Sequence, residues 1–119
     1  MLEAGRTAPE GLAMIEISTD KVVHIIYQSR ESGRSADAEV HAFIDALNDD
    51  EKAHLTALAW VGRGAYDAGA YLEAVAMARA EATVPTDHYL LGMPHLAENL
   101  EAGLEAMGVD VTGEEEDFL

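Results

Sequence analysis

Residues 55–64, Leu55-Thr-Ala-Leu-Ala-Trp60-Val-Gly-Arg-Gly64, decide the fold because they form an almost wholly apolar stretch at helical spacing. They hold the single tryptophan of the chain and an arginine between two glycines. On a wheel of 3.6 residues per turn, apolar residues occupy both sides and only Lys52, Thr56 and Arg63 share a narrow polar stripe. A helix that is apolar nearly all round is surrounded by other helices, so we expect it to be the central element.

Strong signals mark both ends of this helix. Asn48 can cap its first turn, and Glu51, three residues later, completes a capping box. Gly62 allows a neighbouring backbone to approach closely, and Gly64 suits the left-handed position just past a helix end. The sequence therefore predicts a central helix from about Asp49 to Arg63.

Helical spacing recurs along most of the chain, and no strand-like alternation interrupts it. We expect further helices after the capping cluster at Ser18 up to about Glu31, from about Ser35, from a cap at Asp67 to about Ala82, in a short turn after Thr86, and from Pro94 at the favoured first position to just before Gly108. Together these segments predict an all-α fold, a compact bundle of five to six helices around the central one.

Length and composition predict one domain. The chain has 119 residues, of which 49% are hydrophobic, enough for one core. We expect a single helical domain over residues 18–108, preceded by a loose N-terminal segment (1–17) and followed by an acidic C-terminal tail (109–119). No apolar run reaches the length of a membrane span, and the amino terminus lacks a signal-peptide pattern, so we expect a cytoplasmic protein.

The charge is strongly acidic. Seven Lys and Arg residues face 23 Asp and Glu residues, which gives a net charge of −16, and no basic residue follows Arg79. Such a surface repels phosphate backbones and anionic lipids, so we expect no nucleic-acid partner and no membrane partner. Solubility explains the charge, and a basic protein partner is the more specific alternative.

Two spaced motifs carry a resemblance to a known family. The chain contains LNDDEKAHLTALAWVGRGAYD from Leu47 and, later, YLLGMPHLAENLEAGLEAMG from Tyr89. Together they resemble a small bacterial family catalogued as domain of unknown function 3775. The resemblance implies a cytoplasmic helical domain and assigns no activity.

Catalytic and metal-binding signals are weak. The chain has no cysteine, no Gly-x-Ser-x-Gly turn and no phosphate-binding glycine motif. Glu51 and His54 have the Glu-x-x-His spacing of carboxylate-bridged metal sites, but no second copy occurs and Glu51 already serves the capping box. We therefore expect no metal and no cofactor, and we favour a non-catalytic protein over an enzyme. A metal-dependent enzyme using these two residues stays open as an alternative.

The favoured function is a non-catalytic protein-interaction or regulatory module. It predicts an apolar or aromatic patch near Trp60, Tyr66 and Tyr71, used for a protein partner or for self-association into a homo-oligomer. The second hypothesis is a small anionic ligand bound between Arg63 and the amino end of the last helix.

That ligand site would draw on four residues: Arg63, Tyr89, Pro94 and His95. The competing interpretation of Arg63 is that it pairs with its own helix end or stacks on a ring. Tyr89 is also expected to act as an anchor whose hydroxyl finds a partner.

Overall fold

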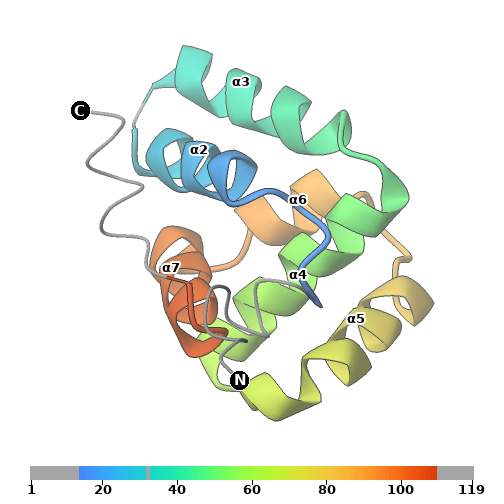
Figure 1. The fold of residues 1–119 in the computed structure, drawn as a ribbon. Coiled ribbons are helices and arrows are strands. Elements are labelled where there is room, and N and C mark those ends of the chain that lie inside the picture. The colour runs from blue at the N-terminus through green and yellow to red at the C-terminus, as the bar shows by residue number, and fades with distance from the viewer. Residues whose placement is uncertain (1–13, 32, 110–119) are drawn as a thin grey trace.

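The computed structural model describes residues 14–31 and 33–109, and within them every regular element is helical (Figure 1). The elements are α2 (Thr19–Arg30), α3 (Arg34–Asp45), α4 (Asp49–Arg63), the short 3₁₀ helix η2 (Ala68–Ala70), α5 (Tyr71–Ala80), α6 (Thr86–Leu91) and α7 (Leu96–Ala106). The predicted all-α bundle is confirmed. None of these helices is long and apolar enough to cross a lipid bilayer.

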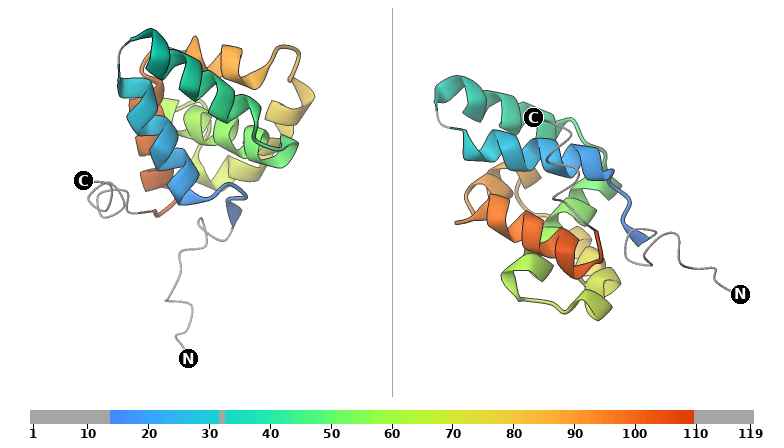
Figure 2. Two further views of the ribbon diagram at one scale, coloured as in Figure 1. Left: turned by 90° about the horizontal axis from the view of Figure 1, so that it is seen from above. Right: turned by 60° about the vertical axis from the view of Figure 1, so that its left-hand side comes forward.

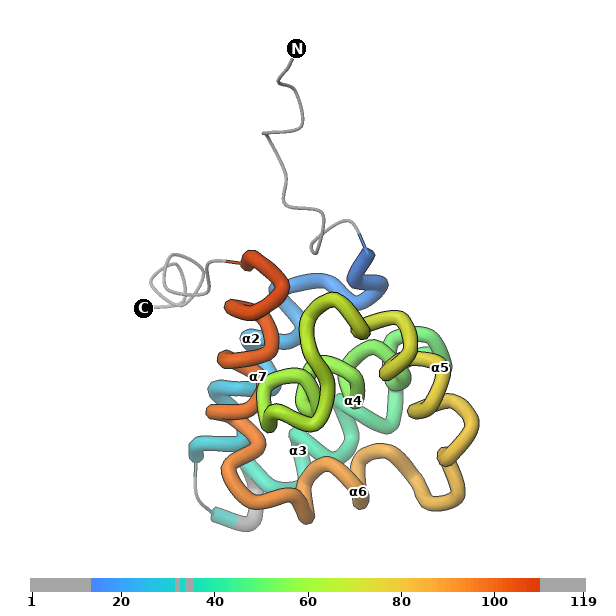
Figure 3. The backbone as a smooth tube through the Cα atoms, turned by 90° about the horizontal axis from the view of Figure 1, so that it is seen from below, coloured from blue at the N-terminus to red at the C-terminus, as the bar shows by residue number. Residues whose placement is uncertain are grey.

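Helix α4 lies in the middle of the bundle, as its sequence predicts. All nine residues from Ala53 to Val61 are buried. The helix packs against α7, α5 and α6, which approach it from different sides (Figures 1 and 3). Helix α2 packs on α7 and on α3, and α3 in turn packs on α6 (Figure 2). The surrounding elements thus cover both apolar sides of α4.

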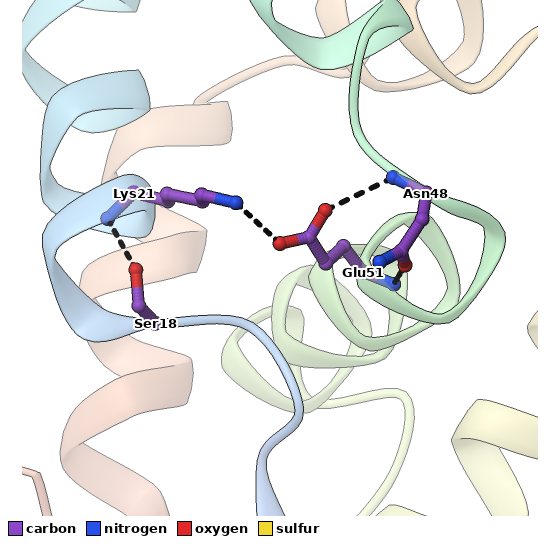
Figure 4. Close-up of polar contacts among 4 residues, drawn as sticks. All are labelled: Ser18, Lys21, Asn48 and Glu51. Atoms are coloured by element: carbon purple, nitrogen blue, oxygen red, sulfur yellow. Dashed lines mark hydrogen bonds and ion pairs between the residues drawn. The ribbon is translucent and has the colours of Figure 1, made fainter.

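The first turn of α4 is held by the predicted capping box. The Asn48 side chain accepts a hydrogen bond from the Glu51 backbone N–H at 2.7 Å, and Glu51 Oε1 accepts one from the Asn48 N–H at 2.9 Å. Glu51 Oε2 lies 2.5 Å from Lys21 Nζ, while Ser18 caps α2 beside it (Figure 4). One glutamate therefore closes its own helix and ties it to α2.

Backbone contact between α4 and α7 explains two glycines. A Cβ at Gly62 would lie 1.7 Å from the Asn99 carbonyl oxygen, and a Cβ at Gly103 would lie 2.1 Å from the Leu58 carbonyl oxygen. Such distances are far inside van der Waals contact, so only glycine fits at either position. The predicted close approach at Gly62 is confirmed, and its neighbour is α7.

Two helix starts differ from the prediction. The last helix begins at Leu96, not at Pro94, because His95 takes a left-handed conformation (φ 60°) that interrupts helical geometry. The segment after Asp67 first forms the 3₁₀ helix η2, and α5 starts only at Tyr71. The Asp67 side chain makes no cap hydrogen bond.

The described N-terminal residues extend the core beyond the predicted boundary at residue 18. Ile17 is buried, and Met14 and Ile15 are half-buried against the core. Ile17 belongs to the same hydrophobic core as the buried residues of α4, and Met14 and Ile15 pack against that core. The rest of the predicted N-terminal segment (1–13) and of the acidic tail (110–119) lies outside the described residues.

Candidate functional site

An aromatic cluster of Trp60, Tyr66 and Tyr89 lies at the C-terminal half of α4, which contributes Trp60. Trp60 is 7% exposed, and its Nε1 donates a hydrogen bond to the Tyr89 hydroxyl at 2.8 Å. Its ring stacks on Tyr66, with centroids 5.8 Å apart, and meets Tyr89 edge to face. The hydroxyl of Tyr89 therefore has the partner that the sequence predicts. The indole is buried with its polar atom satisfied, which makes Trp60 an anchor of the fold.

The predicted surface patch of Trp60, Tyr66 and Tyr71 is wrong in composition. Tyr71 is completely buried, because the first turn of α5 directs it onto α4, and Trp60 is buried as well. Tyr66 alone of the three remains partly exposed. The exposed apolar side chains lie instead at Leu72 and Met77 on α5, and at Val84 and Tyr89 beyond it.

His54 and Tyr71 form a buried polar pair. His54 Nδ1 accepts hydrogen bonds from the Tyr71 hydroxyl at 2.6 Å and from the Glu16 backbone N–H at 3.2 Å. A ring nitrogen that accepts from a backbone N–H carries no proton, so the imidazole is neutral with its proton on Nε2. Burial lowers the pKa of His54 and raises the pKa of Tyr71. The pair therefore stays uncharged.

The neutral His54 predicts a pH dependence of stability. Below its ordinary pKa of about 6.5 the unfolded chain binds a proton that the folded chain rejects, so the free energy of unfolding falls as the pH decreases. The slope for one proton is at most about 1.4 kcal/mol per pH unit. Urea denaturation between about pH 7.5 and pH 5.5 measures it.

A His54→Phe variant should flatten this decline, because it removes the buried imidazole that the folded chain keeps neutral. Glu51 and Asp87 do not interfere, because their pKa values lie below the ordinary 4.5 and 3.8 and they titrate in more acidic solution. If the free energy of unfolding of His54→Phe fell with decreasing pH as steeply as that of the wild type, the assignment of His54 as the buried neutral group would be contradicted.

The geometry gives Glu51 and His54 structural roles. The hydrogen bond from Lys21 and that from the Asn48 N–H lower the pKa of Glu51 and occupy both its oxygens. His54 Nδ1 already accepts two hydrogen bonds. Residues 14–31 and 33–109 contain no group of three His, Cys, Asp or Glu side chains placed to hold a metal ion.

The structure does not gather the four residues of the predicted anion site. Arg63 is exposed at the end of α4, and its guanidinium has no hydrogen bond or ion pair within the described residues. Tyr89 lines a cavity between α4, α5 and α6, whereas His95 lines another between α2, α3 and α7. Pro94 is exposed in the turn before α7. A single site that uses Arg63, Tyr89 and His95 together has no cavity to hold its ligand.

A groove between α4, α5 and α6 was missed by the sequence analysis. It consists of two adjoining cavities of about 240 Å³ and 360 Å³. Four residues line both cavities: Thr56, Ala78, Ala82 and Thr86. Trp60, Val84 and Tyr89 line the first cavity, and Lys52 and Arg79 line the second. These residues come from three helices and from the connection between α5 and α6, so no local pattern indicates the groove.

A second unpredicted feature is a hydrogen bond between a histidine of α3 and an aspartate of α6. His41 Nδ1 lies 3.0 Å from Asp87 Oδ2, and His88 Nε2 lies 4.0 Å from the same oxygen. The hydrogen bond with His41 is the main cause that lowers the pKa of Asp87, against the raising effect of its burial. The contact joins two helices that are far apart in sequence, and it accounts for the buried carboxylate.

These features define a small all-α domain built around one buried helix, with a groove on one side of that helix. The chain belongs to the family described as Protein of unknown function (DUF3775), whose model matches residues 37–109. The matched range contains both sequence motifs and runs from α3 to the end of α7, which confirms the resemblance. No curated protein and no solved structure matches the chain.

Proposed function

We propose that this domain is a protein-interaction module that self-associates through the outer face of α5. That face consists of Leu72, Glu73, Ala76, Met77 and Ala80. The observation that carries the proposal is that α5 is apolar around most of its circumference but is covered on one side only. Leu72 is 57% exposed and Met77 is 41% exposed.

The positions on α5 separate cleanly into two faces. The buried residues are Tyr71, Ala74, Val75 and Ala78, and all of them point toward the core. At 100° per residue, Ala76 lies opposite that group, with Leu72 and Ala80 one turn before and after it. Tyr66 borders a shallow apolar hollow on the same side. An exposed apolar helix face of this kind is typical of association surfaces.

A second copy of this chain fits the outer face better than a charged partner does. The face contains one glutamate, Glu73, and Arg79 borders it, each three residues from Ala76. In an antiparallel contact about a twofold axis at Ala76, Glu73 of one copy lies opposite Arg79 of the other at each end of the contact. Leu72 of each copy then lies level with the small Ala80 of the other. The contact therefore avoids like charges, although the whole chain has a net charge of −16.

The size of α5 limits the strength of this association. A helix of 10 residues is about 15 Å long, so one face of it buries less than the roughly 800 Å² per partner of a standard interface. We therefore expect a reversible dimer with a dissociation constant of about 10 μM or weaker.

The proposal predicts a dimer that one charge on α5 disrupts. Sedimentation velocity between about 1 μM and 1 mM should show the weight-average mass rising from monomer toward dimer. Leu72→Glu places two extra negative charges in the contact and should weaken dimerisation about tenfold or more.

Ala106→Glu is the matched control, since it adds the same charge at an exposed position on α7. It should dimerise almost like the wild type. A chain that stays monomeric up to 1 mM, or an equal loss in both variants, would contradict the assignment of the outer face. The assignment would also be contradicted if the wild-type chain bound polycations such as polylysine but never bound a second copy of itself.

A further inference from the structure

We propose that the groove between α4, α5 and α6 binds a slender organic monocarboxylate, with its carboxylate between Lys52 and Arg79 and its apolar body directed toward Trp60. Lys52, Thr56 and Trp60 lie on successive turns of α4 and line the groove in that order, from the second cavity into the first. Three parts of the groove support the proposal. They are the end lined by Lys52 and Arg79 (the cationic end), the floor of small side chains, and the end lined by Trp60, Val84 and Tyr89 (the apolar end).

The cationic end concentrates positive charge on an acidic protein. Lys52 and Arg79 line the same cavity together with one acidic residue, Asp49, although the whole chain has only seven Lys and Arg residues. Lys52 Nζ is 4.0 Å from Asp45 Oδ1, a long contact, and Arg79 pairs at 2.6 Å with an exposed Asp50. Exposed pairs of this kind contribute little and exchange readily. A ligand carboxylate between the two cations can therefore make a shorter contact with Lys52 than Asp45 does, and can compete with Asp50 for Arg79.

The floor of the groove selects a narrow ligand. It is formed by Ala53, Thr56, Ala78 and Ala82, whose side chains are all small. The Thr56 hydroxyl donates to the Lys52 carbonyl oxygen at 3.0 Å, so the α4 side of the floor has no free donor. Such a floor fits an alkyl chain better than a sugar or a nucleotide, which need polar partners.

The apolar end gives the ligand a place to bury its tail. Val84 is 53% exposed and Tyr89 is 37% exposed where they line the first cavity beside Trp60, and the polar residues Glu81 and Thr83 line the same cavity. Eight residues of α-helix separate Lys52 from Trp60, a rise of about 12 Å. A medium-chain carboxylate spans much of that length, so octanoate is a suitable probe.

This inference does not depend on the proposed dimer. The groove uses Ala78 and Arg79 on α5 and Ala82 beyond its end, whereas the proposed contact centres on Ala76. Arg79, at the border of that contact, is the one residue that both proposals use. Leu72→Glu should therefore leave octanoate binding intact, and failure of either proposal does not affect the other.

The single tryptophan makes the test direct, because Trp60 lines the groove. Titration with sodium octanoate should shift the indole N–H resonance in a ¹H–¹⁵N spectrum and change the fluorescence in a saturable way. Lys52→Gln and Arg79→Gln should each raise the dissociation constant about tenfold. Octanamide, which has the same chain without the charge, should bind at least about tenfold more weakly than octanoate.

Two further variants serve as controls. Arg63→Gln removes an exposed cation outside the proposed site and should leave octanoate binding within about twofold of the wild type. Ala82→Phe, at an exposed position that lines both cavities, should fill the groove and abolish the shift while the circular dichroism stays unchanged. Absence of a saturable shift, equal binding of octanamide, or unaltered binding by Ala82→Phe would overturn the proposal.

Discussion

Replacing Gly62 by alanine should destabilise the domain by about 3 kcal/mol or more, the upper end of the usual cost of overpacking. The added methyl group would lie 1.7 Å from the Asn99 carbonyl oxygen, and a backbone atom cannot move aside as a flexible side chain can. Helices α4 and α7 must separate to admit it, and their contact holds the centre of the bundle together. Urea denaturation followed by circular dichroism measures the loss.

Gly69→Ala is the matched control for this prediction. A Cβ at Gly69 meets no atom within 4 Å, so the same substitution there should change the free energy of unfolding by less than about 1 kcal/mol. Gly103→Ala should resemble Gly62→Ala, because its Cβ would lie 2.1 Å from the Leu58 carbonyl oxygen. If Gly62→Ala is no less stable than Gly69→Ala, the two helices do not touch as described.

Trp60→Ala should cost about 3–5 kcal/mol, the range for truncating a buried aromatic side chain. The substitution leaves a cavity beside α4, removes the ring that stacks on Tyr66 and deprives Tyr89 of its hydrogen-bond donor. Thermal and urea unfolding, followed by circular dichroism, measure the effect without relying on the lost fluorophore.

Tyr89→Phe separates the hydrogen bond from the packing. It removes only the acceptor for Trp60 Nε1 at a position that is 37% exposed, so it should cost about 1 kcal/mol. A Trp60→Ala variant as stable as Tyr89→Phe would mean that the indole contributes little packing and is not an anchor of the core.

Local features of the fold could be predicted because neighbouring residues encode them. The capping box needs only Asn48 and Glu51, three positions apart, and the left-handed end at Gly64 needs one glycine. The apolar character of α4 likewise lies within one helix, so its burial followed from the sequence. The start of α7 could not be predicted in this way. His95 adopts a left-handed conformation, and Pro94 gives no reason to expect it.

Contacts between distant segments could not be predicted. The hypothesis of an interaction module places Tyr71 in a surface patch. Helix α5 is apolar around most of its circumference, and a helical wheel does not say which side of it faces α4. The groove joins Lys52, Arg79 and Tyr89 from three helices, and the hydrogen bond between His41 and Asp87 spans 46 positions. Such groupings depend on how the helices pack, which one sequence does not reveal.

The buried polar groups of α4 also bear on function. His54 is satisfied by Tyr71 and by the Glu16 N–H, and Trp60 is satisfied by Tyr89. These side chains are therefore committed to the fold. The two proposals use other surfaces of the described residues, namely the outer face of α5 and the groove between α4, α5 and α6, where one side of Trp60 is also accessible.

Native-state hydrogen exchange of the backbone amides tests most directly whether α4 is the buried centre of this domain. We expect the amides of residues 53–61 to be the slowest in the chain and to exchange only with the free energy of global unfolding. Amides in the short helix α6 should exchange faster, through local opening. If residues 53–61 exchange as fast as α6, by openings that leave the rest folded, α4 is not the element around which the others pack.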